Sequence, residues 1–473
     1  MLVTVLNHTG TSHHLGCLGA MYALEGELRR RYGPAVGIRR VPSTIDPGWS
    51  SECASGDDFE KLVQEVGNRP VLAEHLDDTD LLVLNGEGTL HWPAANRRVW
   101  LWLAMVEHFK RQCGRAVWVV NSSFFSADKL FLDCAARVFG RVEHLAIRDP
   151  LSLATLRARH LDHAVQAADL VFLTSVRMTG DVADMIASEH EPSLDAGGAP
   201  TLLLAGSSAL TEENRPDWRE TFSRLIEDLT ARHATLQVVF VAQSAMANDL
   251  RLAEELAGRH ANLRLLSADL APVESAWLVG RADLVVSGRF HVNAFAIACG
   301  TPAILLPGNT AKNEGLASLA DSQRYRSLAL EEVEGALAFG RAALRVPGEK
   351  ERSPAKRLFR LAWNNFPADV AASDTQEPVD PSEYLRQVRF AGLMCEWEQG
   401  VRLRQLERRV GRLRELLENE RAALAEFEHI RTSRMCRAIR KMVRLLPCAL
   451  RPTGRRNGMS RGRRSDTRIE RHD

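Results

Sequence analysis

The sequence predicts an α/β protein with two Rossmann-like domains that face each other across a cleft, followed by a C-terminal helical, coiled-coil segment and a basic tail. Short apolar runs, too short to form helices, alternate with longer amphipathic stretches, a pattern typical of parallel sheets covered by helices. This alternation stops near residue 176 and restarts near residue 200. The chain has 473 residues, which is enough for two or three domains of ordinary size.

The first domain, residues 1–176, is predicted from four apolar runs that are each followed by an amphipathic stretch. The runs are 2–6, 80–84, 116–120 and 145–147, and the stretches are 19–31, 97–112, 127–139 and 150–159. In the first stretch, Met21, Leu24 and Leu28 fall on one face of a helix. This order predicts a parallel sheet with helices on its faces.

The second domain, residues 200–345, follows a stretch at 177–199 that is rich in Asp, Glu, Gly and Pro and that we interpret as a linker. Apolar runs and amphipathic stretches alternate again. The runs are 201–205, 236–241, 263–265, 284–286 and 303–306, and the stretches are 216–231, 248–258, 273–279 and 293–299. Two facing domains create a cleft at the ends of their sheets, where ligands of α/β proteins usually bind.

The residues after 345 differ in character from both domains. We interpret residues 346–383 as an extension and flexible linker, because 367–381 is rich in Pro, Asp and Ser. Residues 384–428 carry apolar side chains at a spacing of three and four, which predicts a coiled-coil helix. This helix would join copies of the chain into a homo-oligomer or bind another protein. A single amphipathic helix packed on the body is the alternative.

Residues 429–473 are predicted to form a basic amphipathic helix and a disordered tail. Between 431 and 473 there are fourteen Lys and Arg against three Asp and Glu, although the net charge of the whole chain is +1. Such a helix fits an anionic membrane surface or an acidic partner. No fold that recognises nucleic acids accompanies this charge, so we expect no nucleic-acid partner.

The composition indicates a globular protein of the cytoplasm. Hydrophobic residues make up 45% and charged residues 26% of the chain, which excludes collagen-like, wholly disordered and integral-membrane proteins. The eight cysteines form no CxxC pair, which is typical of reduced thiols in a cytosolic protein. We find no signal peptide and no apolar run long enough for a spanning helix, so we expect contact with a membrane only from its inner surface.

A first polar cluster runs from Asn7 to Cys17 and includes His13 and His14. The loop is small, and it opens a helix whose N-terminus would hold an anion. The histidines and the cysteine would suit zinc, but the second pair of ligands is missing, and we expect no metal.

A second cluster follows the run at 80–84 and reads Asn85-Gly86-Glu87-Gly88-Thr89-Leu90-His91. Gly86 and Gly88 let a ligand approach the backbone, although two glycines at this spacing are a weak signal. A simple turn is the alternative, and it would need neither Glu87 nor His91.

Two further clusters also lie at strand ends. In Arg148-Asp149-Pro150-Leu151-Ser152, either the arginine points into the cleft or it pairs with a carboxylate beside a helix cap. Asp169 would cap the next element or orient that arginine. The strongest cluster is Ser287-Gly288-Arg289-Phe290-His291, followed by Gly300-Thr301-Pro302-Ala303 and Asn309-Thr310-Ala311-Lys312. It sets a fixed cation for a carboxylate or phosphate beside an imidazole that titrates near neutrality.

Taken in order over about residues 1–320, these motifs resemble the polysaccharide pyruvyl transferase family. The resemblance is carried by 86–91, by Arg148-Asp149 with Ser152, by Ala168-Asp169, by 289–291 and by the following Gly-x-Pro and Lys312. Many members carry a four-glycine loop where this chain has Asn85-Gly86-Glu87-Gly88. Nothing similar to the family covers residues 366–473.

The resemblance implies a GT-B-like fold and transfer of a pyruvyl group from phosphoenolpyruvate to a sugar, as a ketal. Arg148 and Arg289 would bind the carboxylate and phosphate of the donor, helped by the Phe290 backbone, while His291 would act at the enol as general acid. Glu87 or His91 would be the base for the sugar hydroxyl. Further substrate contacts are expected from Lys312, Asn309, Gly86, Gly88, Thr89, His13 and His14.

The expected acceptor is a sugar of a cell-surface polysaccharide or of its lipid-linked precursor, and no cofactor is expected beyond phosphoenolpyruvate as the donor substrate. Two other functions stay open from the sequence. A GT-B glycosyltransferase that uses a nucleotide sugar would share the two domains and the cleft, because fold alone does not decide function. A non-catalytic scaffold would instead use the coiled coil and basic tail to recruit a glycan-assembly complex to the membrane.

Overall fold

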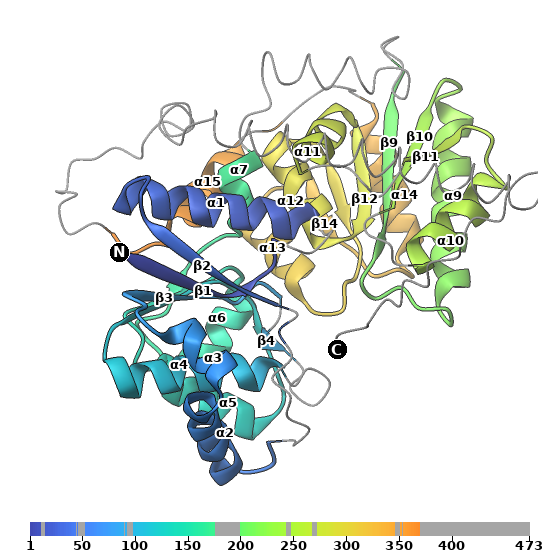
Figure 1. Cartoon of the computed structure of the whole chain (residues 1–473). Coiled ribbons are helices and arrows are strands. Elements are labelled where there is room, and N and C mark those ends of the chain that lie inside the picture. The colour runs from blue at the N-terminus through green and yellow to red at the C-terminus, as the bar shows by residue number, and fades with distance from the viewer. Residues whose placement is uncertain are drawn as a thin grey trace, which may run out of the picture. The chain divides into compact units, whose positions relative to one another are not determined.

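The protein is described by a computed structural model, shown in Figure 1. The structure describes residues 1–10, 15–43, 45, 53–88, 90–91, 98–175, 199–242, 247–266, 272–345, 351 and 353–368. Within these residues the chain forms two parallel six-stranded sheets with helices. The predicted α/β class with two Rossmann-like domains is confirmed.

The first sheet has the strand order β2-β1-β3-β5-β7-β8, and all neighbouring strands are parallel. Its strands are β1 (Leu2–His8), β2 (Gly37–Pro42), β3 (Leu81–Asn85), β5 (Ala116–Ser122), β7 (His144–Ile147) and β8 (Val165–Gln166). The helices of this part are α1 (Leu15–Tyr32), α2 (Gly56–Asn68), α3 (Pro70–Leu76), α4 (Arg98–Cys113), α5 (Lys129–Phe139), α6 (Pro150–Arg157) and α7 (Val171–Ser175). Two short strands, β4 (Leu90–His91) and β6 (Phe124–Phe125), pair with each other.

The second sheet has the order β11-β10-β9-β12-β13-β14 and is also parallel. Its strands are β9 (Thr201–Ser207), β10 (Gln237–Val241), β11 (Leu263–Leu266), β12 (Leu284–Gly288), β13 (Ala303–Leu305) and β14 (Tyr325–Ser327). Its helices are α9 (Arg215–Arg232), α10 (Ala247–Ala257), α11 (Pro272–Arg281), α12 (Phe290–Cys299), α13 (Lys312–Ala320) and α14 (Val333–Ala343).

Helix α12 shows how the local sequence positions the site. It begins directly after β12, with Arg289 as its N-cap, and it ends at Gly300, whose φ of 75° is a left-handed conformation that glycine adopts without a steric penalty. All residues from Phe290 to Ala298 are buried. A helix that is buried on every side has no room to shift, so its first turn is held firmly at the end of the second sheet.

One apolar core contains side chains from both domains. It includes Val3 of β1, Leu203 of β9, Phe172 of α7 and Phe295 of α12, all at most 1% exposed. The two sheets therefore belong to one packed body, and residues at their carboxyl ends can share a site.

One helix of this packed body was not predicted from the sequence. Helix α15 (Ser353–Trp363) lies in the stretch that we interpreted as an extension and linker, and it contacts α7, α12 and α13. Figure 1 shows α15 in orange beside α7 and α1. The rest of that linker, the predicted coiled coil and the basic tail lie outside the described residues. Among the helices that the structure describes, none is long and apolar enough to cross a membrane.

Candidate active site

The carboxyl ends of both sheets border one cavity of about 190 Å³. Its lining residues are Thr9, Cys17, Glu87, Gly88, Arg148, Ser208, Arg289, Phe290, His291 and Lys312. Most of them lie within three residues of the end of a strand of the first or the second sheet. A larger cavity of about 710 Å³ lies among α2, α3 and α4, near the residues that precede β3 and β5. Because α/β proteins bind ligands at the carboxyl ends of their strands, the smaller cavity is the candidate active site.

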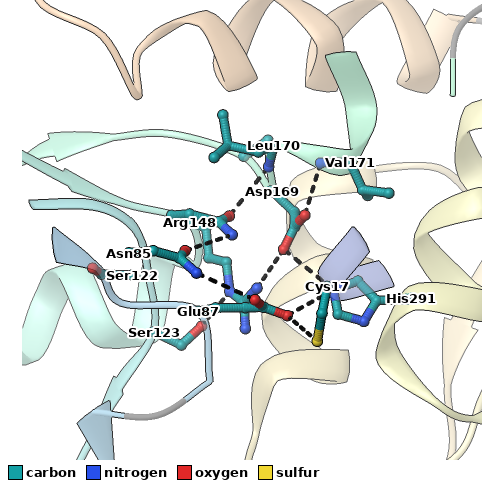
Figure 2. Close-up of polar contacts among 12 residues, drawn as sticks. Cys17, Asn85, Glu87, Ser122, Ser123, Arg148, Asp169, Leu170, Val171 and His291 are labelled. Carbon is teal, nitrogen blue, oxygen red and sulfur yellow. Dashed lines mark hydrogen bonds and ion pairs between the residues drawn. The ribbon is translucent and has the colours of Figure 1, made fainter. Parts of the chain in front are cut away.

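His291 faces two carboxylates that come from the first sheet. Its Nε2 lies 3.7 Å from Glu87 Oε1 and 3.8 Å from Asp169 Oδ2, and Figure 2 shows the ring turned toward both groups. The ring is 5% exposed and meets Phe290 edge to face, with 5.3 Å between the ring centroids. A proton on Nε2 would lie near two negative oxygens, so the arrangement suits an imidazole that carries a proton to a ligand in the cavity.

Glu87 is a buried, ionised carboxylate. Thr9 Oγ1 donates a hydrogen bond to its Oε2 at 2.5 Å, and Cys17 Sγ donates to its Oε1 at 2.8 Å. Burial opposes the charge, but His291 and Arg148 nearby, together with these two hydrogen bonds, lower the pKa of Glu87 below its ordinary value. A carboxylate with a lowered pKa is a weak base, and its negative charge is available to the histidine and the arginine.

Arg148 is held in place by an ion pair and a hydrogen bond. It pairs with Asp169, and its Nε donates to Ser123 Oγ at 2.8 Å. Burial opposes the charge of Asp169, but Arg148 and the His291 ring overcome it and lower the pKa of Asp169 to about 2. The guanidinium also lies over the Phe290 ring, 4.7 Å from its centroid. Arg148 is thus a fixed cation on the first-sheet side of the cavity.

Arg289 is the matching cation on the second-sheet side. Its Nε donates to Asp249 Oδ2 at 3.0 Å, and its Nη2 lies 2.7 Å from Asp249 Oδ1. Asp249 lies in the first turn of α10 and is fully buried. Gly206 of β9 allows this packing, because a Cβ there would lie 2.3 Å from Asp249 Oδ1. Arg289 also lines the cavity, so this two-point pair fixes a cation at its second-sheet wall.

Lys312 differs from both arginines. Within the part of the chain that the structure describes, its ammonium makes no hydrogen bond or ion pair, and it lies 6.0 Å from the centroid of the Phe290 ring. Burial and the neighbouring charge of Arg148 lower the pKa of Lys312 to about 8. A buried ammonium with no hydrogen-bonded or ion-paired partner is costly, and an anionic ligand in the cavity would offset that cost. In the described residues, no group of three His, Cys, Asp or Glu side chains is placed to hold a metal ion.

Comparison with protein families identifies the group to which this site belongs. The model of the polysaccharide pyruvyl transferase family matches residues 20–309, which is more than half of the chain. The chain belongs to this family. A search of the curated proteins finds no match.

Solved structures with a similar fold include UDP-GlcNAc 2-epimerases and a glycosyltransferase. The UDP-GlcNAc 2-epimerase of Methanocaldococcus jannaschii aligns with a TM-score of 0.50 at 13% identity, covering 77% of this chain and 99% of that chain. The Neisseria meningitidis UDP-GlcNAc 2-epimerase aligns at 0.48 with 11% identity, covering 77% and 97%. A Rickettsia africae glycosyltransferase aligns at 0.46 with 10% identity, covering 77% and 92%. At such a low identity, the similarity to the Methanocaldococcus jannaschii enzyme shows the fold alone. In this fold, the pyruvyl transferase family member has two domains, each with a parallel sheet.

The structure brings together most of the residues that the sequence singled out in this family member. The cavity is lined by Glu87, Gly88, Arg148, Arg289, Phe290, His291 and Lys312. Gly86 is not among its lining residues. It packs on β5, where a Cβ would lie 1.9 Å from Ser122 Oγ, so the lack of a side chain allows the close approach of the two strands. Asn309 accepts a hydrogen bond from Ser208 Oγ at 3.1 Å, one residue behind the cavity wall. His13, His14 and Thr89 lie outside the described residues, and His91 is described only as part of β4.

Four further residues of the family member's site were not predicted. Thr9 and Cys17 belong to the first cluster, in which the sequence singled out His13 and His14 as site residues, and Ser208 directly follows β9. Asp249 pairs with Arg289 from another helix. Position after a strand was a usable signal for Thr9 and Ser208. Asp169 fulfils both roles considered for it, because it pairs with Arg148 and also accepts from Val171 N at 2.8 Å.

Proposed function

We propose that this member of the polysaccharide pyruvyl transferase family transfers the pyruvyl group of phosphoenolpyruvate to a sugar and forms a ketal. The observation that carries the proposal is the buried ammonium of Lys312, which shares a cavity with Arg148 and Arg289. Of the cavity's charged residues, these three are cations and Glu87 is the anion. A ligand with a carboxylate and a phosphate offers two anionic groups to this set.

The size of the cavity favours a small donor over a nucleotide sugar. Its volume is about 190 Å³, whereas pockets for larger organic ligands typically have roughly 300–1,000 Å³. A three-carbon phosphorylated acid fits the smaller space. The sugar acceptor would then reach the donor from outside the cavity.

The chemistry needs one acid at the donor. His291 would give a proton to C3 of the enol, which leaves positive charge at C2, and a sugar hydroxyl would form the first C–O bond there. The C–O bond to phosphate then breaks with its electron pair, and a second hydroxyl closes the ketal. One hydroxyl proton replaces the proton given to C3, and the other leaves with inorganic phosphate. A positioned acid typically contributes ~10²–10⁴-fold to the rate.

Glu87 suits a different role from the base that the sequence suggested. Its lowered pKa makes it a weak acceptor for a hydroxyl proton, while its Oε1 lies near His291 Nε2. We propose that Glu87 and Asp169 together hold the His291 ring in the orientation from which it gives a proton to the donor. In this scheme Glu87 is not the base that accepts the proton of the sugar hydroxyl.

Calorimetric titration with phosphoenolpyruvate, and separately with UDP and GDP, tests the proposal. We expect saturable binding of phosphoenolpyruvate by the unaltered protein and none of either nucleotide. Arg289→Lys should weaken donor binding by about 10-fold or more, because lysine keeps a charge for Asp249 but loses the fork that holds two oxygens. Arg289→Ala would also leave Asp249 buried without its pair, so the lysine variant is the safer one.

The matched control is Arg224→Ala. Arg224 is exposed and pairs with Glu334 on the outer face of the second domain, so donor binding should not change. Nucleotide binding without phosphoenolpyruvate binding would contradict the proposal and favour a nucleotide-sugar enzyme. Equal donor affinity in the wild type and Arg289→Lys would remove Arg289 from the donor site.

A further inference from the structure

Three central strands of the first sheet carry asparagines at their carboxyl ends, and the amide side chains of these residues donate hydrogen bonds from one asparagine to the next. Asn7 Nδ2 donates to Asn85 O at 2.6 Å, and Asn85 Nδ2 donates to Asn7 O at 3.2 Å. Asn121 Nδ2 donates to Asn85 Oδ1 at 3.4 Å. All three are fully buried. Asn85 Nδ2 also lies 3.3 Å from Glu87 Oε2, so this asparagine row ends at one of the two carboxylates that face His291.

The row is extended by a residue from the other end of the described chain. Asn365 follows α15, is fully buried, and its Oδ1 accepts a hydrogen bond from Asn121 N at 2.6 Å. Asn121 has a φ of 54°, in the left-handed region, which costs free energy for a residue with a Cβ and is tolerated best by Asn and Asp. The bond from Asn365 to this peptide therefore holds a strained backbone turn in place.

The same two asparagines fix the loop that carries Asp169. Asn365 Nδ2 donates to Ala168 O at 2.8 Å, and Asn121 Oδ1 accepts from Leu170 N at 3.1 Å. Asp169 stands between these two anchored peptide groups, and Figure 2 shows it beside Leu170 and Val171, directed at Arg148 and His291. A buried amide that uses both its oxygen and its nitrogen loses its hydrogen bonds if either partner moves.

We propose that Asn365 is a positioning residue of the active site, which acts on both carboxylates that face His291, through Asn121 and through its own bond to Ala168. One branch runs through Ala168 and Leu170 to Asp169, and the other runs through Asn85 to Glu87. Asn365 lies beyond residue 309, where the family match ends. The expected effect of Asn365 on catalysis rests on the proposed function, whereas the hydrogen bonds of Asn365 do not.

The placement of α15 explains why such a residue has an effect on the site. The helix contacts α7, which begins two residues after Asp169, and α12, which begins with Phe290 and His291. Hydrogen bonds also hold the residues around Asn365 in place. Arg31 donates to Pro367 O at 2.8 Å, and Asn364 O lies 2.9 Å from His144 Nε2. Asn365 is thus held on a fixed support rather than on a free end of α15.

Steady-state kinetics of Asn365→Ala, with Asn364→Ala as the matched control, tests the proposal. Asn364 is the neighbouring residue, and its exposed amide donates to Gln166 O, outside the asparagine row. We expect Asn365→Ala to lower kcat by about 10- to 100-fold, because small displacements of reacting groups have effects of this size. The KM for phosphoenolpyruvate should change much less than kcat, because Lys312 and Arg289 lie outside the row and only Arg148 pairs with a carboxylate that the row positions. Asn364→Ala should leave both constants unchanged.

Asn365→Asp adds a readout that a purely structural role in α15 docking would not give. The new carboxylate can accept from Asn121 N but cannot donate to Ala168 O until it is protonated. Burial raises the pKa of such a carboxyl. We therefore expect kcat of Asn365→Asp to recover in part from about pH 8 to about pH 6 relative to the wild type, while Asn365→Ala shows no such recovery.

A labelling experiment without any donor separates this inference from the proposed function. Cys17 donates its thiol hydrogen to Glu87, at the end of the Asn85 branch. Its alkylation by iodoacetamide, followed by peptide mass spectrometry, should be several-fold faster in folded Asn365→Ala than in the wild type or Asn364→Ala. An unchanged labelling rate with unchanged kcat would overturn the inference. Faster labelling in a protein that binds no phosphoenolpyruvate would leave the positioning role intact and remove the proposed donor.

Discussion

Replacing His291 by alanine should lower kcat by about 10²–10⁴-fold and leave the affinity for phosphoenolpyruvate unchanged. The ring is the acid that the proposed reaction needs at C3, and its Nε2 is 3.7 and 3.8 Å from the two carboxylates that orient it. In the proposed scheme other residues hold the donor's anionic groups, so donor binding and the chemical step should be affected separately. Single-turnover phosphate release measures the chemical step, and calorimetry measures donor binding.

The matched control is His260→Ala. His260 is also a buried imidazole, but its Nε2 bonds to Ser223 Oγ at 3.0 Å inside the second domain, away from the cavity. Its replacement should affect the free energy of unfolding and not kcat. If His291→Ala reduced donor affinity and kcat by the same factor, the ring would be a binding group, and another residue would have to supply the proton.

Most of the two sheets can be predicted from the sequence for a physical reason. The strands β3, β9 and β12 are buried along their whole length, and a strand covered on both faces must be continuously apolar. The edge strand β2 escaped prediction because Arg39 and Arg40 interrupt it, with only Val41 fully buried. Helix α2 was missed although Ser55 caps it and accepts from Asp58 N, a signal that the sequence carries.

Many of the residues that line the cavity can be predicted, because the topology of parallel sheets places strand ends together even where no single motif is diagnostic. Glu87, Arg148 and His291 are far apart in the sequence, yet each follows a parallel strand, and the carboxyl ends of such strands lie at one edge of a sheet. The roles of these residues stay predictions, while their proximity is a property of the fold.

The partners of the cavity residues could not be predicted in the same way. Asp249 precedes Arg289 by 40 residues, and Asn365 follows Asn121 by 244. Neither contact can be predicted from the positions of strand ends, because both depend on how helices α10 and α15 pack. Asp and Asn at such positions are equally common as helix caps and turn residues, so their types alone do not mark them.

Lys312→Met should make the protein more stable and at the same time weaken donor binding by about 10- to 100-fold, the effect of losing one charged hydrogen bond. The lowered pKa of Lys312, about 8, reports the cost of burying its charge. Removing that charge should raise the free energy of unfolding at pH 7 by on the order of 1–3 kcal/mol. Urea denaturation measures the stability, and calorimetry with phosphoenolpyruvate measures the binding.

The difference in stability between the wild type and Lys312→Met should depend on pH in a defined direction. The folded lysine loses its proton near pH 8, whereas an unfolded lysine does so at about 10.4. Between these values the unfolded chain binds more protons, so the stability of the wild type rises with pH relative to Lys312→Met. The stability gap should therefore narrow above about pH 8, and wild-type donor affinity should fall over the same range.

Two further variants separate charge from packing. Lys312→Arg keeps its charge at high pH and should retain donor binding where the wild type loses it. Lys356→Met removes an exposed lysine and should change neither quantity. A Lys312→Met protein that is less stable than the wild type at pH 7 would show that the ammonium supports the fold. In that case the cation is structural, and the donor must be held by Arg148 and Arg289 alone.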